Sequence, residues 1–485
     1  MFHPSRWMAK CRVWYAATFK FSADADYFFL VQPLCRSLQL FGNPVRCLQE
    51  FGTHTEVGYI MYSEYWPATL QYADQGLSTE TLRPLRRNYF GLYKTLATIS
   101  AIHYDASCWF DRAIWIVYRS LPILVNISYF YKAYRLMLFP EDNTSAASVI
   151  ASVWGFTEGT LRICLIELRY GTLASIMSFL NERSYRQQDS LVRQQRATLF
   201  GENNRIQLIL VATMLMEAIW FMTTQLFSRD AFMLQVNGHV VDSIAVQILY
   251  GLLSNVWGLI YVLSFAIFYI IMNTLHLEMS ILLDGITNVQ FTVMRRLKQR
   301  METLAASGHS STIEQQVFWS ILQPELNSHI SRHVDLLDNL KEFSSILGPF
   351  SFVQYYGTFA LIADCGFILS IEGLSANGMI YLLFVTVLVF QSFILCRGIE
   401  KLNDLNEAIG QALYSGFDWP DMLQYDHRFR RQYVTARHTL MIVIGRSQKG
   451  FQCSYGGLGS ISMERFAQLM QKSYSLLTIL LQFAK

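Results

Sequence analysis

Residues 246–275 read VQILYGLLSNVWGLIYVLSFAIFYIIMNTL, and none of these 30 side chains is charged. A helix needs about 20 mainly apolar residues to cross the roughly 30 Å of hydrocarbon in a bilayer. The stretch is therefore long enough to span a membrane. A helix can lie in lipid because its backbone hydrogen bonds are made internally.

The rest of the chain is also apolar. Of its 485 residues, 52% are hydrophobic and only 15% are charged, and the mean hydropathy is +0.24. Ordinary soluble domains have about 25% charged residues. We predict an all-α membrane protein with seven transmembrane helices. These helices are expected at Ala113–Phe139, Ala146–Leu168, Ile206–Phe227, Val246–Leu275, Ile346–Ile371, Gly378–Cys396 and Ser460–Phe483.

Lysine and arginine are distributed unevenly among the loops between these helices. Basic and non-basic loops alternate at every step along the chain. The basic loops are 181–205, 276–345 and 397–455, and the loops with at most one basic residue are 140–145, 228–245 and 372–377. Because basic loops stay in the cytoplasm, we predict a cytoplasmic N-terminus and an extracellular C-terminus.

Three positions near the outer end of the first two predicted spans bear on this orientation. Lys132 and Arg135 are the exceptions to the charge rule, and we expect both to extend their long side chains to the interface. Asn143 begins an Asn-Thr-Ser glycosylation sequon, which the charge pattern places outside.

Residues 1–20 contain no continuous apolar run before a cleavage site, so we expect insertion to start from an internal helix.

The chain is expected to divide into six parts. For the cytoplasmic N-terminal segment, an interfacial helix and packing under the bundle both remain open. Apolar periodicity within 276–345 predicts helices that extend spans four and five, either as spacers or as a packed domain that holds subunits together. The parts are the N-terminal segment at 1–112, spans one to four at 113–275, the cytoplasmic helical extension at 276–345, spans five and six at 346–396, the cytoplasmic anchor segment at 397–455 and the last span at 456–485.

No motif in the sequence indicates an enzyme. The chain lacks a Walker loop, H-E-x-x-H, G-x-S-x-G and a glycine-rich dinucleotide fingerprint. None of the eight cysteines forms a C-x-x-C pair, and the net charge is only +3. We therefore expect no enzyme, no cofactor, no metal and no nucleic-acid partner.

Aromatic side chains gather in the outer halves of the central predicted spans. Apolar walls with a few polar groups are typical of a pocket for a small molecule, although aromatic stripes also serve packing or membrane interfaces. The candidate ligand-binding residues are Phe156, Glu217, Trp220, Phe221, Thr224, Tyr250, Trp257, Tyr381 and Phe384. Charged groups at such depth are costly. Glu217 and Asp364 can either pair with a polar group of another helix or contact a ligand or ion, and both roles remain open. Glu158 and Arg162 are four residues apart and can pair along one helix face.

The last predicted span has a polar stripe. A stripe on a terminal span is typical of a channel wall, and interhelical hydrogen bonding is the alternative. At helical spacing the stripe contains Gln471, Tyr474, Ser475, Thr478 and Gln482.

An ordered series of short motifs occurs over residues 391–475. It contains QSFILC at 391–396, LNEAIGQALY at 405–414, DWP at 418–420, RSQK at 446–449, GG at 456–457, ISMERF at 461–466 and SYS at 473–475. In this series the chain resembles insect odorant receptors. Gustatory receptors end differently, with Thr-Tyr, five apolar residues and Gln-Phe, whereas here seven residues separate Tyr474 from Gln482.

The resemblance implies a tuning subunit of an odorant-gated, non-selective cation channel. It implies assembly with a shared co-receptor through cytoplasmic helices, in the plasma membrane of olfactory sensory neuron dendrites. It also implies an odorant pocket among spans two, three, four and six. Aligned on the SYS motif, the last span has Leu477 and Leu481 at the family's gate, whereas alignment on the glutamine selects Ile479, Gln482 and Phe483. The polar stripe favours the first alignment, and Thr478 and Gln482, which lie on it, are predicted as pore lining.

Two other functions remain as alternatives. A gustatory receptor channel for a tastant would have the same architecture. A G-protein-coupled receptor also has seven spans, but its N-terminus is outside, opposite to the charge pattern here. A secondary transporter would show paired broken helices in two related halves, and the sequence shows no such repeat.

Overall fold

The computed structural model describes residues 88–106, 108–138, 143–224, 232–236, 239–304, 311–416, 427–451, 453–455 and 459–483. These residues belong to one compact unit, Glu80–Lys485. The expectations for residues 1–87, including the interfacial helix, lie outside the described residues.

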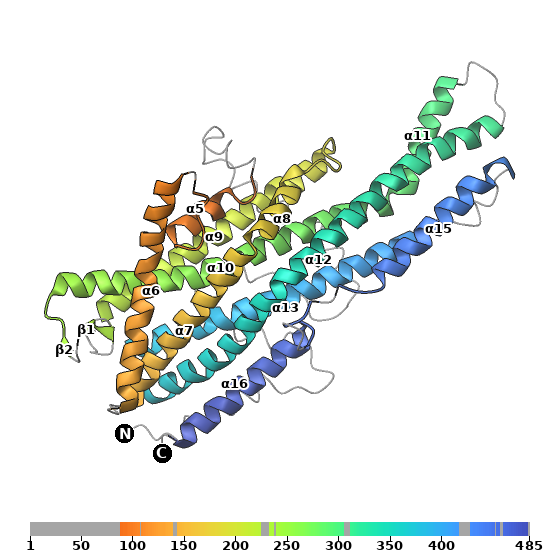
Figure 1. Ribbon diagram of the computed structural model, residues 1–485. Helices are drawn as coiled ribbons and strands as arrows, with labels where there is room; N and C mark the ends of the chain where they lie inside the picture. The colour runs from red at the N-terminus through yellow and green to blue at the C-terminus, as the bar shows by residue number, and fades with distance from the viewer. Residues whose placement is uncertain are drawn as a thin grey trace. The chain divides into compact units, whose positions relative to one another are not determined.

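The described residues are almost entirely helical (Figure 1). The helices are α5 (Gly91–Ile99), α6 (Trp109–Leu138), α7 (Asn143–Leu168), α8 (Tyr170–Glu182), α9 (Ser190–Thr224), α10 (Ile244–Thr287), α11 (Val289–Leu304), α12 (Ser311–Glu372), α13 (Ala376–Ser415), α15 (Arg430–Ser447) and α16 (Met463–Phe483). A short 3-10 helix covers His427–Phe429, and a two-stranded antiparallel hairpin pairs β1 (Gln235–Val236) with β2 (His239–Val240) between α9 and α10.

Seven of these helices have the length that a membrane span requires. Six of them, α6, α7, α9, α10, α12 and α13, are also apolar enough to cross a bilayer. The seventh, α16, has 21 residues, which at 1.5 Å per residue gives about 31 Å. Its polar stripe lowers its hydropathy, but the helix is still long enough to cross the hydrocarbon core. The predicted all-α membrane fold is confirmed.

Three of the spans continue far beyond the membrane. The longest, α12, has 62 residues, or about 93 Å at 1.5 Å per residue, roughly three times the hydrocarbon thickness. It begins at Ser311, whereas the predicted span begins at Ile346. The other two, α10 and α13, continue to Thr287 and Ser415. Helices therefore extend spans four and five through the described part of residues 276–345. Span six is extended by a helix in the same way.

The start of α9 lies within a predicted loop. Residues 181–205 were expected to form a cytoplasmic loop, but α9 begins at Ser190 and runs without a break to Thr224. Hydropathy cannot detect this first part because it is rich in arginine. The helix is held there because Arg196 pairs with an acid on α10.

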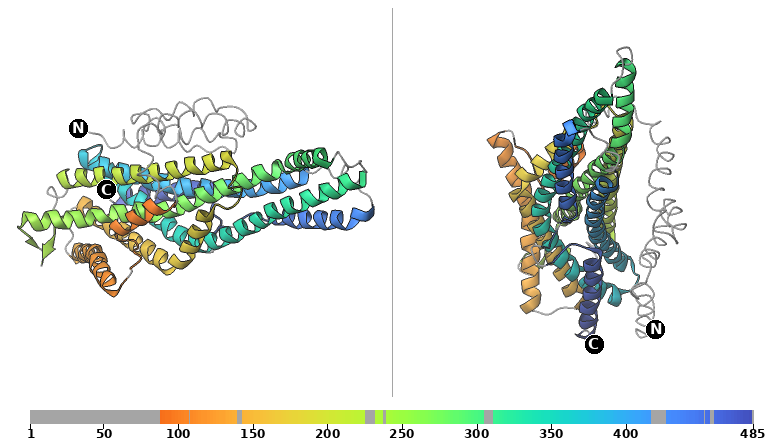
Figure 2. Two further views of the ribbon diagram at one scale, coloured as in Figure 1. Left: turned by 90° about the horizontal axis from the view of Figure 1, so that it is seen from above. Right: turned by 90° about the vertical axis from the view of Figure 1, so that its right-hand side faces the viewer.

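The bundle is organised around α10, which packs against α6, α7, α9, α12 and α13. Buried side chains occur on all sides of its middle part, residues 260–272, as expected where a helix is surrounded by others. Before this part they follow one stripe, from Gln247 to Trp257. On the other side of the bundle α16 packs on α12 and α13. The extended ends of α12 and α13 carry α11 and α15 beside them (Figures 1 and 2).

Candidate functional site

Four aromatic side chains from three helices form one cluster in the outer half of the bundle. Tyr129 of α6 meets Phe156 of α7 edge to face with ring centroids 5.0 Å apart, and stacks on Tyr250 of α10 at 6.0 Å. Phe156 also stacks on Trp257 of α10 at 5.3 Å. Such offset and edge-to-face pairs stabilise beyond the area they bury. We call these four residues the outer aromatic cluster.

Lys132 lies against this cluster. It is only 5% exposed, and its Nζ lies 4.4 Å from the Tyr129 ring centroid and 5.0 Å from that of Tyr250. The ammonium also donates to the Tyr250 hydroxyl at 3.3 Å, and this hydroxyl lies 2.7 Å from Oγ of Ser128. The expectation that Lys132 reaches the interface is therefore wrong, because two aromatic faces and a phenol attract the cation inward.

Arg135, the second exception to the charge rule, is half-buried. Its guanidinium donates to the side chain of Gln235 in β1 at 3.4 Å. The hairpin between α9 and α10 thus provides a partner for this cation at the outer end of α6. Of Lys132 and Arg135, only Lys132 contacts the outer aromatic cluster.

A glycine lets Trp257 lie against α7. A Cβ at Gly159 would come within 3.0 Å of the Trp257 ring, closer than real Cβ contacts normally allow. The indole N–H donates to the backbone carbonyl of Pro122 in α6 at 3.1 Å. Trp257 is therefore fixed from two helices, and its indole has a partner within the bundle, as a buried tryptophan requires.

The four candidates from α9 do not join the outer aromatic cluster through any ring contact among the described residues. Glu217, Trp220, Phe221 and Thr224 are half-buried on that helix. Phe221 instead meets Phe232 at 5.2 Å, and the Thr224 hydroxyl donates to the Trp220 carbonyl of its own helix at 2.7 Å. Oε2 of Glu217 is covered and accepts no hydrogen bond from the described residues.

The two candidates from α13 belong to a neighbouring group. Tyr381 and Phe384 pack in a cluster with side chains of α7, α10 and α12. The Tyr381 hydroxyl donates to Ser148 of α7 at 3.0 Å, and Phe384 meets the Tyr261 ring of α10 at 5.8 Å. The structure therefore divides the predicted pocket residues among three groups rather than one.

Glu158 and Arg162 form the ion pair that their spacing predicts. The Arg162 guanidinium donates to Glu158 at 2.5 Å, and the two side chains are 0% and 3% exposed respectively. Tyr261 donates its hydroxyl to Glu158 at 3.0 Å, and its ring lies 3.9 Å from the guanidinium carbon. A Cβ at Gly357 of α12 would clash with the Glu158 carboxylate. The pair therefore has a structural role, joining α7 to α10 and α12.

A second buried charge network lies in the inner half of the bundle. Glu278 of α10 is 0% exposed, and both of its oxygens accept from Arg196 of α9 at 2.8 Å. Arg332 of α12 donates to the same carboxylate at 2.8 Å. We call Arg196, Glu278 and Arg332 the inner charge network. Nearby, the Tyr89 hydroxyl donates to the Arg196 carbonyl at 3.1 Å, and burial raises the pKa of Tyr89 to about 12.

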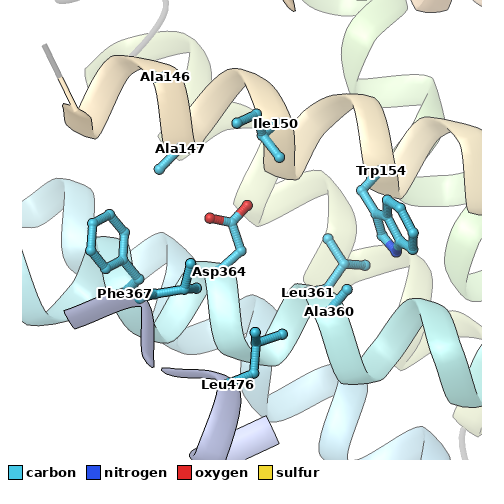
Figure 3. Close-up of a pocket in the computed structure, with 10 residues that line it drawn as sticks. Ala146, Ala147, Ile150, Trp154, Ala360, Leu361, Asp364, Phe367 and Leu476 are labelled. Atoms are coloured by element: carbon cyan, nitrogen blue, oxygen red, sulfur yellow. The ribbon is translucent and has the colours of Figure 1, made fainter. Parts of the chain in front are cut away.

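A hollow of about 370 Å³ opens between α7, α12 and α16. Asp364 is its one charged lining residue, and the carboxyl group points from α12 toward α7 (Figure 3). Oδ2 of Asp364 is covered and accepts no hydrogen bond from the described residues. The other lining residues are Ala146, Ala147, Ile150, Trp154, Ala360, Leu361, Phe367, Leu476 and Leu480.

The predicted pore residues of α16 face different ways in the isolated chain. Leu477 and Leu481 pack against the cluster that contains Tyr381, whereas Gln482 is exposed. Thr478 is half-buried, and its hydroxyl donates to the Tyr474 carbonyl at 2.9 Å. Asn143 begins α7, but its side chain lies outside the described ones.

Sequence reasoning missed three members of the site on α6. Ser128, Tyr129 and Lys132 were not candidates, although a signal was present. The buried positions of α6 include Val125, Asn126, Tyr129 and Lys132, which recur every three or four residues. That period places Lys132 on the buried face of the helix.

Seven helices have spanning length, and five of them pack around the apolar helix α10. With aromatic and few polar side chains gathered in one half, this bundle defines a multi-pass α-helical membrane protein. The model of the 7tm odorant receptor family matches residues 150–474. The chain belongs to this family, whose members are receptors rather than enzymes.

Individual relatives match shorter parts of the chain. Odorant receptor 85f of Drosophila melanogaster is 26% identical over 153 residues, covering 32% of this chain and 36% of that protein. Odorant receptor 45a of the same species is 31% identical over 109 residues, covering 22% and 29%. Odorant receptor Or2 of Anopheles gambiae is 22% identical over 185 residues, covering 38% and 44%. Each match thus spans less than half of the relative.

The fold is similar to that of the olfactory receptor OR5 of Machilis hrabei, whose structure is known alone and in complex with eugenol. The TM-score is 0.58 at 12% sequence identity, and the match covers 83% of this chain and 99% of OR5. At this identity the likeness shows the fold alone. That fold extends over nearly the whole of OR5, well beyond the shorter sequence matches.

Proposed function

We propose that this chain is the tuning subunit of an odorant-gated, non-selective cation channel. It binds a small, mainly apolar volatile molecule in the outer half of the bundle and shares its pore with co-receptor subunits. The observation that carries the proposal is the outer aromatic cluster with Lys132 and the Tyr250 hydroxyl beside it. Family membership supports the same function.

The chemistry of this cluster favours a ligand with an aromatic or apolar body and one oxygen. Aromatic walls provide contact area, and a few polar groups fix the orientation. Tyr250 and Lys132 together can donate to a ligand oxygen, because they form a connected polar pair on one side of the rings. Eugenol, which OR5 of Machilis hrabei binds, has an aromatic ring and oxygen substituents, and it therefore belongs in the first panel of test ligands.

The pore is assigned to α16. In a channel, side chains that face water line the conduction path, and hydrophobic rings close it by dewetting. Gln482 and Thr478 are proposed as pore lining, and Leu477 and Leu481 as the gate. Since both leucines pack on the core of their own subunit, a gate formed by them requires α16 to rotate about its axis between the closed and open states.

Assembly is assigned to the cytoplasmic extensions of α10, α12 and α13. The long helices leave the membrane together with α11 and α15 beside them, and this region can meet neighbouring subunits. The functional location is the plasma membrane of olfactory sensory neuron dendrites, with the N-terminus inside.

The experiment is a whole-cell current recording from cells that express the chain with or without an odorant co-receptor. Eugenol and related volatiles are expected to evoke a cation current only when both proteins are present. Tyr250→Phe, which removes the hydroxyl contacts of Ser128 and Lys132, is expected to shift the concentration–response curve at equal surface level. Robust current from the chain alone, or no current with the co-receptor over a broad panel, would contradict the proposal.

A cysteine scan tests the assignment of the pore helix. Cysteines at 478 and 482 are expected to react with a water-soluble, membrane-impermeant thiol reagent and to reduce the evoked current. Cysteines at 476 and 480 line the hollow within the chain and serve as controls. Current block mainly at 476 and 480 would show that another face of α16 lines the pore.

A further inference from the structure

The hollow between α7, α12 and α16 is separate from the outer aromatic cluster. Its walls are alanine, leucine, isoleucine and aromatic side chains, and none of the four cluster residues lines it. Its volume of about 370 Å³ falls within the range of small-molecule pockets. The hollow is thus large enough for a ligand of its own.

Two side chains give this hollow its chemical character. Asp364 provides a half-buried carboxylate that lines the hollow, and its covered Oδ2 accepts no hydrogen bond from the described residues. Trp154 lies on the facing helix, and its indole borders the same space (Figure 3). A carboxylate attracts a cation, and the apolar walls, which include the Trp154 indole, suit an apolar body that carries the charge. Asp364 therefore favours a positively charged group in an otherwise apolar hollow.

A metal ion does not fit this arrangement. Calcium takes six to eight oxygen ligands and magnesium takes six, whereas Asp364 supplies the only carboxylate among the lining residues. An organic ammonium needs fewer polar partners, because its carbon body is solvated by the apolar walls. The walls here match such a body.

We propose that this hollow is a second ligand site, which binds an ammonium group carried on an apolar body, with the nitrogen at Asp364. Leu476 and Leu480 of α16 form part of its wall. A bound amine therefore contacts the helix that is proposed to line the pore. Binding of the amine in the hollow is expected to affect the position of that helix. The binding step itself does not depend on the proposed channel function.

The test measures binding directly, without current. The purified chain in phosphatidylglycerol nanodiscs is titrated with radiolabelled 2-phenylethylamine and, separately, with 2-phenylethanol, which has nearly the same shape but no charge. Asp364→Asn is expected to weaken amine binding by about tenfold or more, because it removes one partner of a buried charge pair. The same substitution is expected to leave binding of the alcohol unchanged.

Glu325→Gln is the control. Glu325 lies on the same helix as Asp364, pairs with the half-exposed Arg296 and does not line the hollow. Amine affinity is expected to remain within about twofold of that of the unmodified chain in this variant. Equal loss in both carboxylate variants, or no loss in Asp364→Asn, would overturn the proposal.

A neutral variant keeps the test valid if Asp364→Asn does not fold. Ala146→Leu adds apolar volume to the wall of the hollow without changing a charge, and it is expected to abolish saturable amine binding. Retained amine binding in this variant would also overturn the proposal.

The ammonium can come from a free amine or from a lipid headgroup. Discs with equal parts of phosphatidylglycerol and phosphatidylethanolamine are compared with discs in which phosphatidylcholine, which has no N–H, replaces the phosphatidylethanolamine at the same surface charge. A lower apparent amine affinity in the phosphatidylethanolamine discs, seen in the unmodified chain, assigns the site to the headgroup. An unchanged affinity assigns it to a free amine, and in both cases an ammonium binds at Asp364.

Discussion

Glu278 and Asp364 are both acids within helices of the same bundle, but their surroundings differ. Glu278 lies in the inner half, where it accepts three hydrogen bonds from Arg196 and Arg332. Asp364 lies in the outer half, where one of its oxygens is covered and accepts no hydrogen bond from the described residues. Glu217 has the same deficit.

Buried polar side chains therefore have two different roles in this bundle. In the inner half both oxygens of Glu278 accept hydrogen bonds from arginines, so this carboxylate joins α9, α10 and α12 and has no oxygen left for a ligand. In the outer half Asp364 and Glu217 each have a covered carboxylate oxygen that accepts no hydrogen bond from the described residues. Buried polar groups without partners are costly, and a ligand that supplies the missing partner gains affinity. We therefore assign structure to the inner half and recognition to the outer half.

The largest effect is expected from Glu278→Gln. Removing this charge leaves Arg196 and Arg332 buried without their partner, and breaking a buried ion pair costs about 3–5 kcal/mol. The measurement is the thermal unfolding of the detergent-solubilised protein together with its surface level in cells. Glu325→Gln is the control, since its partner Arg296 is 50% exposed and such a pair contributes at most about 1 kcal/mol. Similar losses in both variants would contradict the structural role of the inner charge network.

The next effect concerns the ion pair of Glu158 and Arg162. Gly357→Ala places a methyl group on the Glu158 carboxylate, and overpacking of this kind costs about 1–3 kcal/mol. Gly155→Ala is the matched control, because a Cβ there meets no atom within 4 Å. That variant is expected to be neutral or slightly stabilising in the same unfolding assay. Equal stability of the two alanine variants would show that α12 does not approach α7 this closely.

A smaller effect is expected at Lys132. Lys132→Met keeps the apolar stem but removes the ammonium from the Tyr129 and Tyr250 rings. Because a hydrogen bond contributes about 0.5–1.5 kcal/mol, losing the ammonium as a donor to the ligand should shift the concentration–response curve for an oxygen-bearing ligand by roughly twofold to tenfold. Arg135→Met, at the same end of α6, should shift it far less. If both curves coincide with that of the unmodified chain, Lys132 does not take part in recognition.

The smallest effect is a pH dependence from the connection before α6. Burial acts to lower the pKa of His103, but hydrogen bonds to Glu167 and Asp105 outweigh it and raise this pKa above its ordinary value. The charged imidazole therefore stabilises the fold at low pH, and this contribution is lost as the pH rises through the raised pKa. The melting temperature of His103→Gln should fall below that of the unmodified chain at pH 5.5, and the gap should close by pH 8.5. A gap that widens with pH would contradict this sign.

The transmembrane organisation follows from the sequence because a bilayer imposes a simple rule. Long apolar runs such as Val246–Leu275 have no other stable environment, so each predicted span coincides with a helix. The pairing of Glu158 with Arg162 also follows, since residues four apart share a helix face. Both inferences need only local information along the chain.

The site required information that the sequence does not contain directly. Lys132 appears as an exposed exception to the charge rule, yet its surroundings come from Tyr250, which lies far away along the chain. The arginine-rich start of α9 resembles a loop, yet Glu278 on another helix holds Arg196. In both cases the partner of a charge decides its position, and the partner is known only from the packing of the helices.

Two buried tryptophans allow the most direct test of this division. Trp257 is 3% exposed in the outer aromatic cluster, and Trp319 is 6% exposed on the inner extension of α12. Each is replaced by phenylalanine, and ligand-evoked current is recorded with the co-receptor alongside surface level. Trp257→Phe should shift the half-maximal ligand concentration by roughly tenfold, about 1.4 kcal/mol, at normal surface level, whereas Trp319→Phe should leave that concentration unchanged and lower the surface level instead. A shift for Trp319→Phe with none for Trp257→Phe would contradict the assignment of recognition to the outer half.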